Sequence, residues 1–96
     1  MPEVYILHFE TPLWGKAQHY AGSTKFTAER RLLVHKSGQG SHMCRYAVKQ
    51  GIDFTIVYTE ECKSYGDAIR RERKLKKGGN LSHHCRICNE ELVKHE

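Results

Sequence analysis

The feature that most limits the fold is a set of three short stretches rich in β-branched and aromatic residues. They read VYILHF at 4–9, HYAGS at 19–23 and DFTIVYT at 53–59. Alternation of apolar and polar residues, clearest in the third stretch, is typical of a strand with one buried face. Because the turn-like stretch between the first two contains Pro12 and Gly15, we predict a hairpin with a long loop.

Three further segments have the start and stop signals of helices. We predict helices over 28–36, 42–50 and 65–77. Their caps are Thr27 before the first, Gly51 after the second, Ser64 with Asp67 in a capping box before the third, and Gly78 and Gly79 after it. These residue types satisfy the free backbone groups at helix ends. The predicted fold class is α/β (α+β), a small three-stranded antiparallel sheet flanked by about three helices.

Ninety-six residues are enough for one domain with a modest core. We expect that domain to occupy 1–80, followed by a short Cys/His-containing tail over 81–96. No apolar run approaches the roughly 20 residues that a membrane span needs, and the first residues lack the basic start of a signal peptide. We therefore expect a cytoplasmic protein without a membrane partner. The net charge of +5 favours phosphate-rich partners without proving one.

The last predicted helix carries an acidic residue where an apolar one is expected. Helical periodicity places Glu72 in the apolar stripe that Ala68, Ile69 and Leu75 form. An unpartnered buried carboxylate costs several kcal/mol. Glu72 should therefore have an arginine, a lysine or a metal ion beside it.

The first predicted helix has a matching irregularity. Arg31 and His35, one turn apart, border its apolar face and should point toward the sheet, whereas Arg30 should face solvent. One interpretation is structural: an ion pair between Glu72 and Arg31, a core histidine, and tyrosines that only pack.

The combination of residues favours chemistry instead. Tyr5 and Tyr20 lie in the first two predicted strands, so we expect them to meet Arg31, His35 and Glu72 on one side of the sheet. Glu72 can hold a hard divalent ion such as Mg²⁺, which needs few protein oxygens. A guanidinium can bind a phosphate oxygen, and a phenol or imidazole can handle a proton of attacking water. These are the functional groups that phosphodiester cleavage needs.

The order of these motifs resembles the GIY-YIG endonuclease family in its small, single-domain form. The motifs are VYIL at 4–7, HYAGST at 19–24, ERRLLVH at 29–35 and AIRRERKLKKGGN at 68–80. The resemblance covers roughly residues 3–80. In this chain the first motif lacks its initial glycine and the second has Ala21 in place of isoleucine.

The resemblance implies a DNA endonuclease that uses one Mg²⁺ or Mn²⁺ ion. Tyr5 would activate the attacking water with help from His35, and Tyr20 would position the water or the phosphate; the two tyrosines could exchange roles. Arg31 would neutralise charge on the phosphate, and Glu72 would bind the metal. The family's late asparagine corresponds to Asn80, with Asn89 as the alternative.

The basic face of the last helix is the predicted DNA contact. Its residues are Arg70, Arg71, Arg73, Lys74, Lys76, Lys77 and Asn80, with Arg45, Lys49 and Lys63 as additions. Contacts with the phosphate backbone position a protein on DNA but do not distinguish one base sequence from another. Because no recognition module is visible, we expect selectivity for a DNA structure or targeting by a protein partner. The alternative function is a non-catalytic nucleic-acid-binding module of the same fold.

The four cysteines raise a separate question. Cys85 and Cys88 have the spacing of half a zinc site, and four ligands would require Cys62, Cys44, a histidine or a second chain. The alternative, which the sequence favours, is a pair of reduced thiols in a mobile tail. Structural zinc is accordingly the less favoured cofactor.

Overall fold

The computed structural model describes residues 1–79 and 81–89. Its elements follow the order β1 (Glu3–Phe9), β2 (His19–Thr24), α1 (Ala28–Lys36), α2 (His42–Gln50), β3 (Phe54–Glu61), α3 (Tyr65–Gly78) and the 3₁₀ helix η1 (Leu81–His84). The first two helices have the predicted bounds. The strands and α3 end within two residues of the predicted positions.

The strands form one antiparallel sheet in the order β2-β1-β3, which confirms the predicted fold class. β1 lies in the centre, so Tyr5 pairs with Gly22 on one side and with Thr59 on the other. β2 has a neighbour on one side only. Its free edge is therefore open to side chains from both faces of the sheet.

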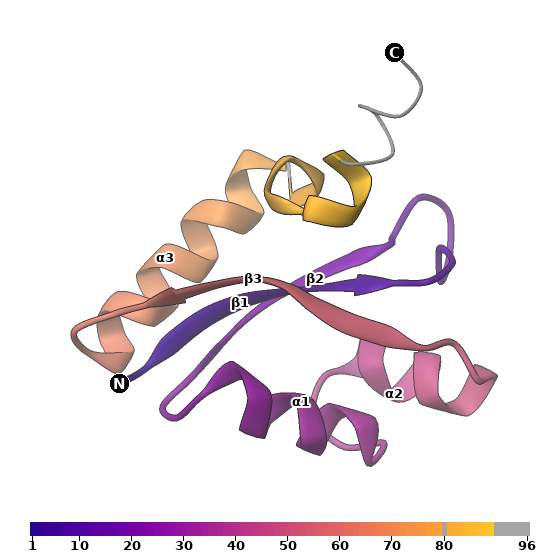
Figure 1. The fold of residues 1–96 in the computed structure, drawn as a ribbon, viewed down its shortest axis with the longest axis horizontal. Helices are drawn as coiled ribbons and strands as arrows, with labels where there is room; N and C mark the ends of the chain where they lie inside the picture. The colour runs from indigo at the N-terminus through magenta and orange to yellow at the C-terminus, as the bar shows by residue number, and fades with distance from the viewer. Residues whose placement is uncertain (80, 90–96) are drawn as a thin grey trace.

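Helices cover both faces of the sheet. Figure 1 shows α3 and the C-terminal segment 81–89 on one face and α1 with α2 on the other. Val4 and Ile6 belong to the core on the α3 face, whereas Tyr5, Leu7 and Phe9 belong to the core on the α1 face. This division follows from the alternation of side chains along a strand.

The predicted caps account for the helix ends. The Thr27 side chain accepts a hydrogen bond from the backbone of Arg30, and Ser64 accepts one from the backbone of Asp67. Gly51 and Gly79 end α2 and α3 with φ of 72° and 68°, in the left-handed region that suits glycine. The local signals therefore place the helices correctly.

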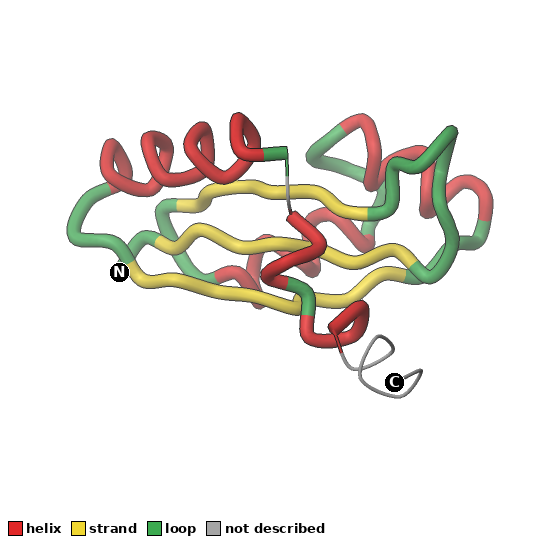
Figure 2. Tube along the Cα trace, turned by 90° about the horizontal axis from the view of Figure 1, so that it is seen from above, coloured by secondary structure: helices red, strands yellow, loops and turns green. Residues whose placement is uncertain are grey.

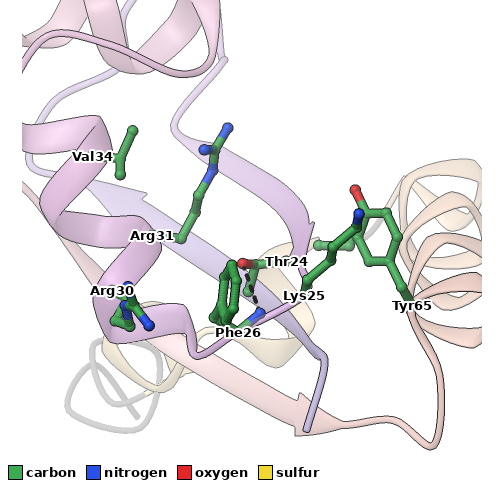
Figure 3. Close-up of a pocket in the computed structure, with 8 residues that line it drawn as sticks. Thr24, Lys25, Phe26, Arg30, Arg31, Val34 and Tyr65 are labelled. Carbon is green, nitrogen blue, oxygen red and sulfur yellow. Dashed lines mark hydrogen bonds between the residues drawn. The ribbon is translucent and has the colours of Figure 1, made fainter.

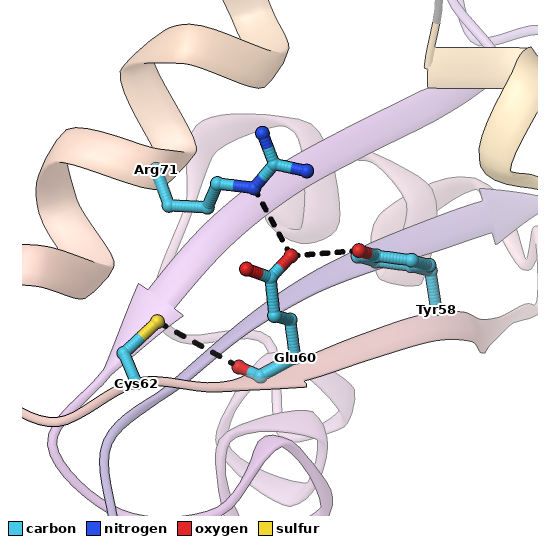
Figure 4. A network of polar contacts seen from close by, with 4 residues as sticks. All are labelled: Tyr58, Glu60, Cys62 and Arg71. Atoms are coloured by element: carbon cyan, nitrogen blue, oxygen red, sulfur yellow. Dashed lines mark hydrogen bonds and ion pairs between the residues drawn. The ribbon is translucent and has the colours of Figure 1, made fainter.

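A polar network joins α3 to β3. Glu60 accepts hydrogen bonds from the Tyr58 hydroxyl at 2.7 Å and from Arg71 Nε at 3.0 Å (Figure 4). The Arg71 and Glu60 side chains are each 35% exposed. Arg71, which the sequence assigned to the DNA-contacting face, is thus paired at the junction between α3 and β3.

The C-terminal segment lies against the sheet. Cys85 is fully buried, and Leu81, Ile87 and Cys88 pack against the core on the α3 face. Figure 2 shows this segment crossing over the strands, beyond the end of α3. The expectation of a polar tail does not hold for residues 81–89, because Cys85 is buried and the other apolar side chains are partly buried against the core. None of the helices within 1–79 and 81–89 has the length and apolar character to span a membrane.

Candidate active site

Tyr5 is buried on the α1 face, directly against the backbone of Gly22. A Cβ atom at residue 22 would lie 2.5 Å from the Tyr5 hydroxyl oxygen and 2.9 Å from the Tyr20 ring. Real Cβ atoms do not approach other atoms so closely, so only glycine leaves room for both phenols. The glycine of the second motif is explained by this contact.

His35 orients the Tyr5 hydroxyl. The Tyr5 oxygen lies 2.8 Å from His35 Nε2, and the backbone N–H of Ser41 donates to His35 Nδ1 at 3.4 Å. The Ser41 contact favours a ring proton on Nε2, whereas the backbone hydrogen bond at Gln39, which raises the pKa of His35, favours a ring nitrogen that donates to a carbonyl. In either tautomer His35 Nε2 fixes the direction of the Tyr5 hydroxyl.

Burial keeps these groups neutral. Burial and the charge of Arg31 lower the pKa of His35 to about 4. Burial and the neighbouring Tyr20 raise the pKa of Tyr5 above its usual value, and Arg31 offsets only part of that rise. Burial also raises the pKa of Tyr20. Arg31 therefore acts on the pKa of Tyr5 in the direction that favours a phenolate, but burial has the larger effect.

The neutral His35 predicts a pH dependence of stability. Between about pH 6.5 and pH 4 the unfolded chain binds a proton on His35 that the native protein does not, so stability falls as the pH falls. The loss attributable to His35 should reach roughly 3 kcal/mol at pH 4. Urea unfolding of the wild type and of His35→Gln at several pH values measures it.

The difference between these two proteins isolates His35 from other titrating groups. The wild type should lose its advantage over His35→Gln as the pH is lowered, whereas His83→Gln, which removes an exposed histidine, should keep the wild-type slope. A constant difference between wild type and His35→Gln from pH 7 to 4 would contradict the assignment.

Glu72 reaches the edge of β2 from the opposite face. Its Oε1 accepts from the Ser23 hydroxyl at 2.7 Å, and its Oε2 accepts from Lys76 Nζ at 2.8 Å. The Glu72 side chain is 19% exposed. Lys76 also lies 5.5 Å from the centre of the Tyr20 ring. Lys76 and Tyr20 therefore connect the carboxylate to the pair formed by Tyr5 and His35.

A pocket of about 380 Å³ lies beside this edge. Figure 3 shows Arg30, Arg31 and Val34 on one side and Lys25 with Tyr65 on another. Ser23, the hydrogen-bond partner of Glu72, also lines it. The pocket is thus bordered by cations and reaches the residue that holds the carboxylate.

The predicted catalytic residues are therefore arranged around the edge of β2. Tyr5, Tyr20 and His35 contact one another, with ring centres 5.6 to 6.3 Å apart. Arg31 acts on the pKa values of Tyr5 and His35. Within the described residues, Glu72 forms its ion pair with Lys76 rather than with the Arg31 of the structural interpretation.

Several residues of the site were not predicted. They are Ser23 and Ser41. The pairing of Lys76 with Glu72 was not predicted either, because we expected Lys76 on the DNA-contacting face. The spacing of Glu72 and Lys76, four residues apart on one helix, was a visible signal for their pairing. Ser23 and Ser41 contact partners far along the chain or across a loop, and no local pattern indicates them.

Four basic residues of α3 have the i, i+3, i+4 and i+7 spacing of one exposed helix face, namely Arg70, Arg73, Lys74 and Lys77, whereas Arg71 and Lys76 lie on either side of it. Lys76 pairs with Glu72, Arg71 with Glu60, and Arg70 with Asp67. Arg73, Lys74 and Lys77 are exposed. Asn80 lies outside the described residues, and the side chain of its alternative, Asn89, donates to the backbone carbonyl of His83 at 3.0 Å.

Glu72 suits a hard divalent ion. A carboxylate has about four acceptor positions, and Ser23 and Lys76 use two of them. Mg²⁺ is held by one or two carboxylates while it keeps several waters, so one partly exposed glutamate beside an open pocket meets its needs. Lys76 would have to share the carboxylate with the ion.

The fold and the site together describe a small α+β domain with two phenols, an imidazole, a guanidinium and a carboxylate at one sheet edge. Residues 1–82 match the family described as the GIY-YIG catalytic domain. This match covers most of the 96 residues, and the chain belongs to the GIY-YIG family, a family of nucleases. No curated protein and no solved structure matches the chain significantly.

Proposed function

We propose that the protein is a metal-dependent endonuclease that hydrolyses phosphodiester bonds in DNA. The observation that carries the proposal is the hydrogen-bonded pair of Tyr5 and His35 beside a pocket lined by Arg31, with the Glu72 carboxylate at the same sheet edge. Membership of a nuclease family supports the reaction class.

The pocket would receive the scissile phosphate. Its cations, Lys25, Arg30 and Arg31, attract a phosphate group, and the planar guanidinium of Arg31 can bind two of its oxygens. Arg30 also stacks on Phe26, 4.8 Å from the ring centre. Arg31 would then stabilise the negative charge that grows on the phosphate as water attacks.

The Tyr5 hydroxyl would orient the attacking water. With its oxygen 2.8 Å from His35 Nε2, Tyr5 can exchange a proton with His35 and hydrogen-bond to the water or to a phosphate oxygen. The water oxygen bonds to phosphorus and one of its protons is released to solvent, while the P–O bond to the leaving sugar oxygen breaks and that oxygen takes up one proton from solvent. A divalent ion on Glu72 would supply electrostatic stabilisation of the leaving oxygen.

The cations of the site would contact phosphates, which carry no sequence information, so we propose selectivity for a DNA structure or targeting by a protein partner. A panel of supercoiled plasmid and of nicked, flapped, branched and plain duplexes, assayed with Mg²⁺, Mn²⁺ or EDTA, tests the function. We expect cleavage with metal and none with EDTA. Binding of DNA without cleavage in every metal would instead support the non-catalytic module of the same fold.

Lys76 should compete with the metal for Glu72. In Lys76→Met the carboxylate loses an ammonium at 2.8 Å, so we expect half-maximal cleavage at a roughly 2- to 5-fold lower Mg²⁺ concentration, as for a pair worth about 0.5–1 kcal/mol. Mg²⁺ titration of cleavage at saturating DNA measures it. Lys77→Met, one residue along the helix, should leave the midpoint unchanged. An unchanged or higher midpoint in Lys76→Met would contradict the competition.

A further inference from the structure

Four metal-binding side chains converge on the α3 face of the sheet, at a site separate from Glu72. His8 comes from β1, His19 from the paired position of β2, and Cys85 and Cys88 from the C-terminal segment. Their four ligand atoms all lie within 4.8 Å of one another. Across residues 1–79 and 81–89, these four side chains form the one group of three or more potential ligands that meets this condition.

Four of the six separations between these ligand atoms match the edges of a tetrahedron around a small ion. His8 Nδ1 lies 3.2 Å from His19 Nε2, 3.4 Å from Cys85 Sγ and 3.8 Å from Cys88 Sγ, and Cys88 Sγ lies 3.6 Å from His19 Nε2. Tetrahedral zinc with its usual bond lengths places two nitrogens about 3.3 Å apart and a nitrogen and a sulfur about 3.5 Å apart. The protein therefore holds the donor atoms at ligand spacing.

Hydrogen bonding alone does not explain this arrangement. His8 Nδ1 faces the three other ligand atoms at once, although a ring nitrogen offers one proton or one lone pair. His8 and Cys85 are buried, at 9% and 0% exposure, so solvent does not account for the convergence. A central cation would satisfy all four atoms together.

We propose that His8, His19, Cys85 and Cys88 bind one structural zinc ion. Two thiolates and two neutral imidazoles in a tetrahedral array are preferred ligands of Zn²⁺. Because all four ligands come from the protein, no coordination position is left for a catalytic water, as is typical of a structural site. Binding releases the two thiol protons. The half site that the sequence showed is thus completed by two strand histidines, whereas Cys44 belongs to the core on the opposite face of the sheet.

The fold explains how the ligands meet. His8 follows Val4 and Ile6 at every second position of β1, so it faces α3 and pairs across the sheet with His19. A helical turn at 86–89 follows Cys85 and brings Cys88 to the same side. A pocket of about 440 Å³, lined by His19 and Cys88, provides an entry path.

The zinc ion would fasten residues 81–89 to the sheet. Two ligands belong to paired strands and two to the segment that crosses them, so the ion cross-links elements about 70 to 80 residues apart. His19 also directly precedes Tyr20, whose side chain lies on the other face of β2. The ion would therefore hold the end of β2 that carries Tyr20, without touching the nuclease substrate.

The full-length protein tests the proposal without any cleavage assay. We expect one zinc per chain by elemental analysis, retained in excess Mg²⁺. Replacement by Co²⁺ should give the visible spectrum of a tetrahedral thiolate site. Removal of zinc by a chelator should lower the melting temperature by about 10 °C or more.

Ligand variants and a matched control complete the test. Cys88→Ser and His19→Gln, at two half-buried positions, should lose zinc, whereas Cys62→Ser, a buried thiol of the same core outside the cluster, should keep it. If one ligand variant fails to fold, the other and the cobalt spectrum of the wild type still decide. Zinc below one equivalent, iron in its place, or zinc retained in both folded ligand variants would overturn the proposal.

Discussion

Glu72→Ala is expected to lower metal-dependent DNA cleavage by about 10³-fold or more. The change removes the carboxylate that would hold the divalent ion, and the loss of several kcal/mol of transition-state stabilisation corresponds to that factor. Affinity for DNA should stay the same or rise slightly, because Lys76 loses its 2.8 Å partner and its charge becomes available to phosphate. Single-turnover cleavage and a binding titration in Ca²⁺ separate the two effects.

A second carboxylate on the same face provides the control. Glu60 also pairs with a cation of α3, at 3.0 Å from Arg71, but it lies on β3 rather than at the edge of β2. Glu60→Ala should therefore keep cleavage within about 3-fold while losing a comparable surface ion pair. Glu72→Gln, which preserves the shape of the side chain, should be as inactive as Glu72→Ala. Cleavage by either Glu72 variant at the wild-type rate would contradict the role of Glu72.

The elements of the fold were predictable because their signals are local. Thr27 and Ser64 cap α1 and α3 as predicted, and Gly51 ends α2 in the left-handed conformation. The alternating stretch 53–59 corresponds to β3, which continues to Glu61. Caps and alternation depend on residues within one turn or one strand, so a single sequence contains them.

The sequence predicted that the candidate side chains lie near one another, but it did not predict the contacts between them. Helical periodicity correctly turned Arg31 and His35 toward the sheet, and the order of the motifs indicated the family. The hydrogen bond from Ser41 to His35 depends on the path of a loop, which no local sequence pattern indicates. The balance between burial and Arg31 at Tyr5 depends on packing density, which no sequence pattern measures.

The ligands of the proposed zinc site were also only partly predictable from the sequence. Cys85 and Cys88 were visible because their spacing is local. His8 and His19 became candidates only once the register of β1 and β2 and the direction of the C-terminal segment were known. We predicted a polar tail there because the few apolar residues of the segment are spread among polar ones.

Gly22→Ala is expected to disrupt the site through one methyl group. The added Cβ would lie 2.5 Å from the Tyr5 oxygen and 2.9 Å from the Tyr20 ring, so both phenols would have to move in a buried region. Overpacking of this kind costs about 1–3 kcal/mol of stability. A shift of the catalytic groups by about 1 Å should lower cleavage by about 10²-fold. Urea unfolding and single-turnover cleavage measure the two effects.

Gly78→Ala is the matched control, because it adds the same methyl group where no other atom lies within 4 Å. Gly78 is the last residue of α3, so alanine there should leave cleavage unchanged and raise stability by up to about 1 kcal/mol. The comparison separates crowding at Tyr5 from the general effect of replacing a glycine. If Gly22→Ala cleaved DNA as fast as Gly78→Ala, the contact between Gly22 and Tyr5 could not be what positions the phenol.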